Sequence, residues 1–455
     1  MEHFGPILSV LCIIVVARLL LKKYHPQAVL LIAGLVMMVA SLFLGKELPL
    51  LSEATGATGF DLFKFITLSF SETNAGVGLM IMAIGGFVAY IDKIGASNAL
   101  VSVAMVPLGL FKAKPYLAAS LVIPIGQALF VAIPSAAGLS LLLMASMFPV
   151  LTSLGVSRLS AASVITATTA FGMGPASAIT ASASSIIDMD IAKYFIDHQL
   201  FLVLPLSLIM MFTYYFVNKY FDKKNQQEVS KAATLSASEQ PKVHKIYALI
   251  PVLPIILLIA FSGLFSSIST SIKLDTTTAM IISLFVALIF ELIRTRDLMG
   301  VFNSMKIFWD GMGNIFKTVV TLIIAADIFA KGLISLGFID GLLALTQNLG
   351  FNAIGIGIVM SLLIFLASML MGSGNASFFA FGPLVPDLAS KLGISTVKMI
   401  LPMQLSASMG RTVSPVAGLI IAVSDIAGVT PLQIVKRNLI PLVVALLFML
   451  LIHYV

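Results

Sequence analysis

Charged residues are scarce in this sequence: Asp, Glu, Lys and Arg make up 10% of its 455 residues, while apolar residues make up 59%. A soluble domain carries about 25% charged residues, so most of this chain must face something other than water. Several apolar runs exceed the roughly 18 residues that identify a candidate membrane helix. The composition therefore excludes a soluble globular protein and predicts an all-α polytopic membrane protein.

Cysteine and membrane-embedded histidine are also lacking. Cys12 is the single cysteine, so one chain can form neither a disulfide framework nor a thiolate metal cluster. None of the five histidines lies in the middle of a predicted span, and the sequence has no HExxH motif. Both absences argue against an intramembrane enzyme and a histidine proton relay. We expect no catalytic residues, no metal site and no cofactor, and leave Na⁺ or H⁺ open as a coupling ion.

Basic residues exceed acidic residues, with 27 Lys and Arg against 20 Asp and Glu. They lie in short loops between apolar segments and not on one stripe, which is typical of topology signals and not of a nucleic-acid site. Most of them fall on inside loops if the N-terminus lies outside and the chain alternates sides. We therefore predict that both termini lie outside and that a polar linker, 221–245, lies inside. The first apolar run is predicted to be a retained helix, with a cleaved signal peptide as the alternative.

Apolar segments of membrane length are predicted at 5–22, 27–44, 75–93, 198–217, 246–265, 276–294, 314–335 and 433–453. Two longer apolar regions, 116–153 and 352–390, contain small polar residues near their centres and predict re-entrant hairpins. Two further segments are predicted to be helices broken by Gly and Pro: 158–187, broken at 171–175, and 396–427, broken at 409–415.

The order of these features occurs twice, with an offset of about 238 residues. It predicts an N-terminal repeat, 1–220, and a C-terminal repeat, 246–455, each with five transmembrane helices and one re-entrant hairpin. An odd number of crossings gives the repeats inverted topology, which is typical of secondary transporters. Chance similarity between two apolar segments rich in Gly and Ser is the alternative.

The four interruptions are the places where chemistry is expected. Irregular backbone at membrane depth survives only where it lines a cavity or is buried in protein, and helix N-termini there favour a carboxylate or phosphate. Close packing of helices through small residues is the alternative. The candidate binding residues are small or polar residues of the interruptions, together with one arginine: Ser135, Gly138, Gly174, Ser177, Ser373, Gly374, Asn375, Arg411, Thr412 and Ser414.

Arg411 is the charge that most needs a function, because it lies in a segment otherwise without charge. A cation at the centre of a bilayer costs about 2.5–3.5 kcal/mol, so it should face a cavity or have a partner. Its guanidinium could bind an anionic substrate, with two parallel hydrogen bonds if the anion is a carboxylate. The alternative is a structural pair with a buried acid such as Asp327. However, Asp327 and Lys331 are four residues apart and most simply pair with each other.

Several C-terminal runs resemble a known family. They read Gly372-Ser373-Gly374-Asn375-Ala376, Phe379-Ala380-Phe381, Gly410-Arg411-Thr412-Val413-Ser414-Pro415-Val416, and Val435-Lys436-Arg437 with Pro441. These runs resemble the anaerobic C4-dicarboxylate carriers of the Dcu C-type family, and the similarity extends over the whole chain. The Gly-Arg-Thr-x-Ser-Pro run, placed after Gly-Ser-Gly-Asn, is the most specific part of it.

The resemblance implies an ion-transporter-superfamily fold, in which a scaffold domain forms a homodimer and a transport domain moves as an elevator. It implies uptake, efflux or exchange of succinate, fumarate or malate across a bacterial inner membrane, with the dicarboxylate and membrane lipid as partners. Both termini would then be periplasmic and the linker cytoplasmic. In that family the first broken helix carries a run like Pro-Thr-Ser-Gly-Asp, whereas residues 174–180 here contain no acid. The identity of the substrate therefore stays open, with another small carboxylate, an amino acid or a channel function as alternatives.

Overall fold

The computed structural model describes residues 4–46, 48, 54–111, 114–224, 244–261, 272, 274–348 and 352–454, which fold into α-helices joined by short 3-10 and π-helical turns. Nine helices in these ranges are apolar enough and long enough to cross a membrane. The protein is therefore a multi-pass membrane protein. Most of the predicted linker, and the end of the predicted span 246–265, lie outside the described residues.

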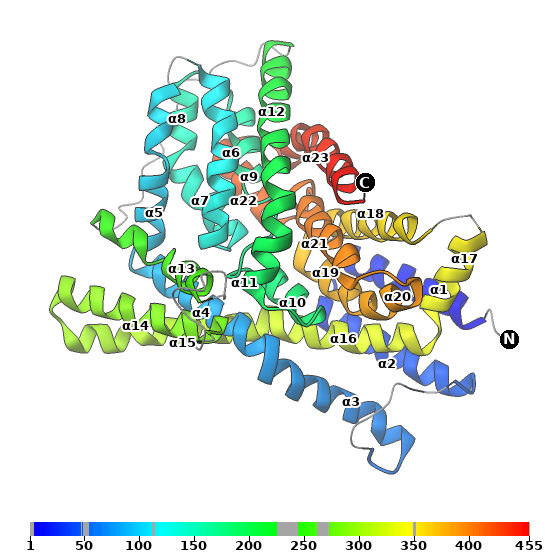
Figure 1. The fold of residues 1–455 in the computed structure, drawn as a ribbon. Helices are drawn as coiled ribbons and strands as arrows, with labels where there is room; N and C mark the ends of the chain where they lie inside the picture. The colour runs from blue at the N-terminus through cyan, green and yellow to red at the C-terminus, as the bar shows by residue number, and fades with distance from the viewer. Residues whose placement is uncertain are drawn as a thin grey trace.

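Two series of helices follow each other along the chain (Figure 1). The first consists of α1 (Phe4–Leu21), α2 (Pro26–Phe43), α3 (Thr58–Thr73), α4 (Leu79–Lys93), α5 (Ala96–Ala104), α6 (Pro115–Ala132), α7 (Ala136–Ser146), α8 (Phe148–Ser153), α9 (Arg158–Ala167), α10 (Ala178–Ile186), α11 (Ile191–Tyr194) and α12 (Phe201–Lys224). The second consists of α13 (Leu253–Ala260), α14 (Thr276–Thr295), α15 (Leu298–Ile315), α16 (Thr321–Ser335), α17 (Phe338–Asn348), α18 (Ala353–Met371), α19 (Gly374–Phe381), α20 (Val385–Leu392), α21 (Thr396–Thr412), α22 (Gly418–Ala427) and α23 (Pro431–Tyr454).

Two helical segments are longer than the sequence predicts. The segments Thr58–Lys93 and Leu298–Ser335 contain 36 and 38 residues, whereas only 75–93 and 314–335 are apolar enough to be recognised as spans. Leu298–Ser335 continues through a π-helical turn at Phe316–Val320, and at about 1.5 Å per residue it far exceeds the ~30 Å hydrocarbon core. Thr58–Lys93 consists of two helices that meet at a kink in the turn Asn74–Gly78, where Gly76 has the non-helical angles φ −104° and ψ −112°. The prediction missed their polar N-terminal parts, and it also missed the short helices α5 and α17.

The second break begins later than the sequence predicts. The helix α21 continues through Gly410 and Arg411 to Thr412, and the irregular backbone covers 413–417. Gly410 does not break the helix but packs against α18, since a methyl group there would lie 2.2 Å from the Phe365 carbonyl oxygen. The first break, between α9 and α10, covers 168–177 and is longer than the predicted 171–175.

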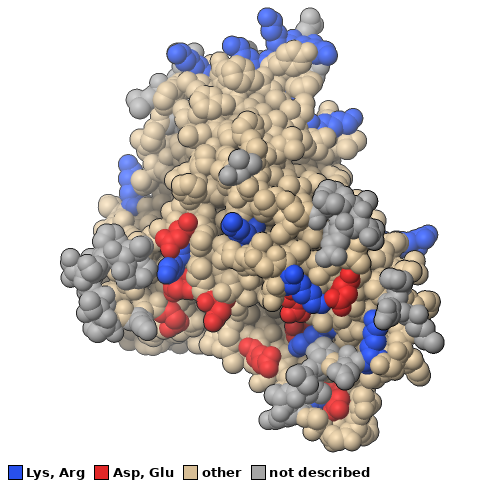
Figure 2. Space-filling model, turned by 45° about the vertical axis from the view of Figure 1, so that its right-hand side comes forward, with Lys and Arg blue, Asp and Glu red and all other residues tan. Residues whose placement is uncertain are grey.

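The charged surface is uneven. Figure 2 shows Lys and Arg side chains gathered at the top of the molecule, at the level at which Figure 1 shows the end of α12. Near that end, α12, α9 and α23 are joined by a buried ion pair. Arg437 donates through Nη1 to Asp222 at 2.8 Å and to the Ser160 hydroxyl at 2.8 Å, and the side chains of Arg437 and Asp222 are each 4% exposed.

Glycines allow α2 and α16 to cross closely, low in the view of Figure 1. A methyl group on Gly34 of α2 would lie 2.5 Å from the Ile328 carbonyl oxygen, and one on Gly332 would lie 2.7 Å from the Gly34 carbonyl oxygen. Such contacts between small residues are a main source of helix association in membranes.

We expect Gly34→Ala to lower the midpoint of thermal unfolding of the purified protein, because backbone atoms must move to admit the methyl group. Overpacking of this kind costs about 1–3 kcal/mol. Gly59→Ala in α3 is the matched control, since no atom lies within 4 Å of its added methyl group. Equal midpoints for the two variants would show that the crossing is not tightly packed.

Candidate functional site

Arg411 links the end of α21 to the first break. Its Nη2 donates a hydrogen bond of 2.5 Å to the Thr169 carbonyl oxygen, in the irregular segment between α9 and α10. Its Nε is buried and has no hydrogen-bond partner. Within the described part of the chain, no carboxylate lies within ion-pair distance of Arg411. The guanidinium therefore keeps donors and an uncompensated positive charge that an anion could use.

The acid proposed as an alternative partner of Arg411 is already paired. Asp327 lies 2.7 Å from the Lys331 amino group, one helical turn away in α16, which confirms the pair expected from their spacing. It also accepts a hydrogen bond of 2.6 Å from the Ser69 hydroxyl of α3. A structural pair between Arg411 and Asp327 is therefore not formed.

The backbone of the first break is held by two buried glutamines. Gln404 of α21 donates to the Gly172 carbonyl oxygen at 2.7 Å, and Gln199 accepts from the Gly174 N–H at 3.0 Å. Both glutamines also donate to the Thr180 hydroxyl at 3.1 Å, and the Tyr194 hydroxyl donates to Gln404 at 2.8 Å. Buried backbone groups left unpaired would cost free energy. These side chains therefore stabilise the irregular backbone between α9 and α10 by pairing its main-chain groups.

These bracing residues were not predicted from the sequence. Their signal was an uncharged polar side chain inside an apolar segment, at Gln199 and Gln404. Of the predicted residues in the first break, Gly174 has φ +93° and lies against Val131 of α6, where a methyl group would come within 2.6 Å. Ser177 precedes α10 and is buried, with 6% of its surface exposed.

The two hairpin tips are built alike. The Ser135 hydroxyl accepts from the Gly138 N–H at 3.1 Å and caps α7, and the Ser373 hydroxyl accepts from the Ala376 N–H at 3.2 Å and caps α19. Both serines are half-buried, as is Asn375. Serine is a favoured N-cap, so each tip presents the N-terminus of a helix that begins inside the protein.

The second hairpin tip lies against α21 and the second break. A methyl group on Gly374 would lie 2.8 Å from the Ala407 carbonyl oxygen, and one on Gly372, which has φ +72°, would lie 3.0 Å from the backbone of Val416 and Ala417. The predicted Gly374 and the residues around Arg411 are thus brought together.

The remaining predicted residues form hydrogen bonds with residues close to them in sequence. The Thr412 hydroxyl donates to the Ser408 carbonyl oxygen at 3.0 Å, and the buried Ser414 hydroxyl accepts from the Val416 N–H at 3.4 Å. Ser135 and Gly138 bond to each other, and the described contacts do not join them to the second tip. Direct contacts therefore connect Arg411 with the first break and the second tip with the second break.

Metal-binding groups are absent from the part of the chain that the structure describes: it contains no cluster of three or more His, Cys, Asp or Glu side chains placed to hold an ion. The groups near the breaks that a ligand could contact are main-chain carbonyl oxygens, hydroxyls, two amides and one guanidinium.

Comparison with known proteins identifies the family of this chain. The profile of the family described as DcuC, C4-dicarboxylate anaerobic carrier, matches residues 4–455. The anaerobic C4-dicarboxylate transporter DcuC of Escherichia coli K12 is 32% identical over 450 residues, covering 97% of this chain and 94% of its own length. A probable anaerobic C4-dicarboxylate transporter DcuC of Vibrio cholerae is 32% identical over 433 residues, covering 95% and 93%.

A solved structure shares the fold. The YdaH transporter of Alcanivorax borkumensis superposes with a TM-score of 0.61 at 16% identity, covering 94% of this chain and 98% of its own. The family of this chain consists of transporters and not of enzymes, so the intramembrane-enzyme hypothesis falls. The chain belongs to the DcuC family of anaerobic C4-dicarboxylate carriers.

Proposed function

We propose that the protein is a secondary carrier that moves C4-dicarboxylates, such as succinate, fumarate and malate, across a bacterial inner membrane by uptake, efflux or exchange. The observation that carries the proposal is Arg411, a cation without an acidic partner in the described structure, placed where the end of α21 meets the first break. Membership in the DcuC family supports the choice of dicarboxylates.

In this proposal each end of the substrate meets a different part of the site. One carboxylate binds the Arg411 guanidinium, whose planar fork matches two carboxylate oxygens. The other binds free N–H groups at a hairpin tip, where the first turn of α19 or α7 gives a partial positive charge. The substrate must be small, because Gly374 and Gly372 already bring the second tip against α21 and the second break.

Two inverted repeats are supported by paired features of the two series of helices. The π-helical turns at Asn74–Gly78 and Phe316–Val320 occupy the same place in each. Packing is also reciprocal: α2 packs on α16 as α14 packs on α4, and α7 packs on α22 as α19 packs on α10. We further propose that hairpins and broken helices form an elevator-type transport domain, carried by a dimeric scaffold that includes the long helices.

The transport assay is exchange in proteoliposomes. Vesicles that contain the purified protein and internal succinate should take up external labelled succinate, and unlabelled fumarate and malate should compete. An amino acid or a monocarboxylate that competes better than any dicarboxylate would overturn the substrate class. Currents of single-channel size would instead favour a channel. Repeating the assay without sodium distinguishes sodium coupling from proton coupling or pure exchange.

We propose a topology with both termini periplasmic and the linker cytoplasmic. In Figure 1, α1 begins and α23 ends in the right-hand half of the view, whereas Figure 2 shows Lys and Arg gathered without acidic residues at the top, at the level where α12 ends. In a variant whose Cys12 is replaced by Ser, a cysteine at Ala54 should react with a membrane-impermeant maleimide in intact spheroplasts. A cysteine at His244 should react only after lysis; both positions are exposed and lie outside the long helices. The reverse labelling pattern would show that the proposed orientation is inverted.

A further inference from the structure

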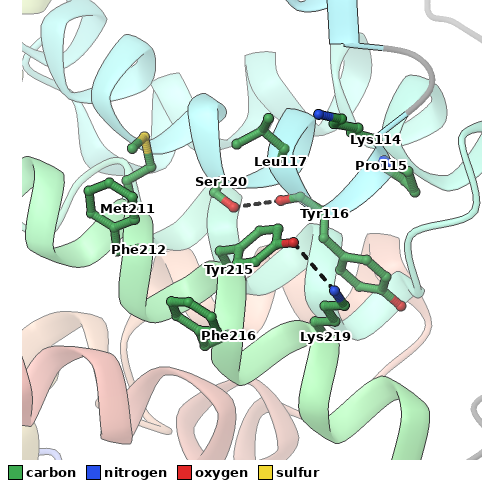
Figure 3. Close-up of a pocket in the computed structure, with 10 residues that line it drawn as sticks. All are labelled: Lys114, Pro115, Tyr116, Leu117, Ser120, Met211, Phe212, Tyr215, Phe216 and Lys219. Atoms are coloured by element: carbon green, nitrogen blue, oxygen red, sulfur yellow. Dashed lines mark hydrogen bonds between the residues drawn. The ribbon is translucent and has the colours of Figure 1, made fainter.

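A cavity of about 530 Å³ lies between the first turns of α6 and the last turns of α12, away from the breaks described above. Figure 3 shows its lining residues, which come from these two helices and from the residue before α6. They are Lys114, Pro115, Tyr116, Leu117, Ser120, Met211, Phe212, Tyr215, Phe216 and Lys219. Its volume is within the range of small-ligand sites, about 300–1,000 Å³.

The inner part of the cavity is apolar and open to the side of the helices. Met211, Phe212 and Phe216 lie on one face of α12, and Leu117 lies opposite on α6. Phe212 and Phe216 are 57% and 65% exposed, although both helices are candidate membrane spans. A groove between two membrane spans faces the lipid tails, so it suits an alkyl chain.

The outer part of the cavity is cationic. Lys114 and Lys219 are both exposed, and their side chains reach the cavity from the residue before α6 and from α12 respectively (Figure 3). The Lys219 amino group donates to the Tyr215 hydroxyl at 3.4 Å, and no acidic side chain is among the lining residues. Residues 211 to 219 of α12 span about 12 Å at helical rise, so the cavity runs from a charged end into the apolar membrane.

We propose that this cavity is a binding site for an anionic phospholipid, with the phosphate at Lys114 and Lys219 and an acyl chain along Phe212 and Phe216. A zwitterionic lipid would bring a third cation to a site that already holds Lys114 and Lys219. Basic pockets between membrane helices bind anionic headgroups in this manner, and long lysine side chains reach the interface while their stems stay in apolar surroundings. The site is separate from the proposed dicarboxylate site and does not depend on it.

The test is native mass spectrometry of the delipidated full-length protein, titrated with phosphatidylglycerol or with phosphatidylcholine. We expect one phosphatidylglycerol to bind more tightly than further copies and more tightly than phosphatidylcholine. The double variant Lys114→Gln/Lys219→Gln should bind phosphatidylglycerol about 25-fold more weakly, or about fivefold for each lysine removed. Leu117→Trp, which fills the apolar part, should weaken the binding of phosphatidylglycerol without a change in charge.

The control is Lys223→Gln/Lys224→Gln, which removes two charges from the end of the same helix without altering the lining of the cavity. It should keep the wild-type affinity, and size-exclusion chromatography should show all variants to be folded. Equal affinity for the two lipids, or an unchanged affinity after removal of both lining lysines, would overturn the proposal. So would competition by free glycerol phosphate at the concentration of the lipid, because that would show a simple phosphate site.

Discussion

Replacing Arg411 with Ala should abolish dicarboxylate exchange while leaving the protein folded. Two charge-assisted hydrogen bonds contribute about 1.5–3 kcal/mol each, so exchange should fall by at least about a hundredfold. Stability should fall by no more than about 1–3 kcal/mol, the cost of leaving the buried Thr169 carbonyl oxygen without its donor, since Arg411 has no acidic partner among the described residues and its Nε makes no hydrogen bond. Exchange of labelled succinate in proteoliposomes and thermal unfolding of the same preparation measure the two effects.

Two further variants make the result specific. Arg411→Lys keeps the charge but loses the planar fork, so its exchange rate should lie between those of Arg411→Ala and the unchanged protein. Arg18→Ala removes an exposed arginine at the end of α1 and should exchange at the normal rate. If Arg411→Ala exchanged normally, the site assignment would be wrong. If it instead lowered the unfolding midpoint strongly, Arg411 would have a structural role.

Arg437→Met should be among the most destabilising single substitutions in this protein. It would leave the Asp222 carboxylate buried and without its cation, next to the neutral hydroxyls of Ser160, at 2.8 Å, and Tyr116. Breaking a buried ion pair from one side costs about 3–5 kcal/mol. We expect a marked fall in the midpoint of thermal unfolding, measured by fluorescence in detergent.

The double variant Asp222→Leu/Arg437→Met should recover much of that loss, because apolar residues can replace a buried pair at little cost. Lys391→Met is the surface control: Lys391 pairs with Asp340, and their side chains are 44% and 69% exposed. An exposed pair contributes about 0–1 kcal/mol, so this variant should unfold close to the wild-type midpoint. Equal effects of Lys391→Met and Arg437→Met would contradict the importance of burial.

The sequence predicted best those features for which a membrane allows few alternatives, such as long apolar runs and charged residues at membrane depth. Apolar length identified most spans. Arg411 was singled out because a lone cation at membrane depth requires a reason, and its role in binding stays a prediction. The Asp327–Lys331 pair followed from helical spacing and is observed. The predicted helix boundaries were less accurate where glycine was the signal, because glycine can either end a helix or allow close packing. Gly410 suggested a break, yet in the structure it lets α21 pack closely on α18.

The long helices and the glutamine braces show what sequence patterns cannot resolve. The polar residues Glu72 of α3 and Asp310 of α15 lie within helices, but they end the apolar runs by which spans are recognised. Gln404 and Gln199 are single uncharged residues among apolar neighbours, and their importance depends on which main-chain groups they meet. Those groups belong to a break that is distant in sequence from Gln404.

The first break takes part in the candidate site through main-chain atoms. Arg411 binds the Thr169 carbonyl oxygen, and Gln404 binds the Gly172 carbonyl oxygen. Alanine-scanning mutagenesis changes side chains and leaves these acceptors in place. Such a scan would report the first break through its bracing side chain Gln199 and its closely packed Gly174, but not through the two carbonyl oxygens that face α21. Amide-to-ester exchange, which weakens a carbonyl acceptor, would test those two contacts directly.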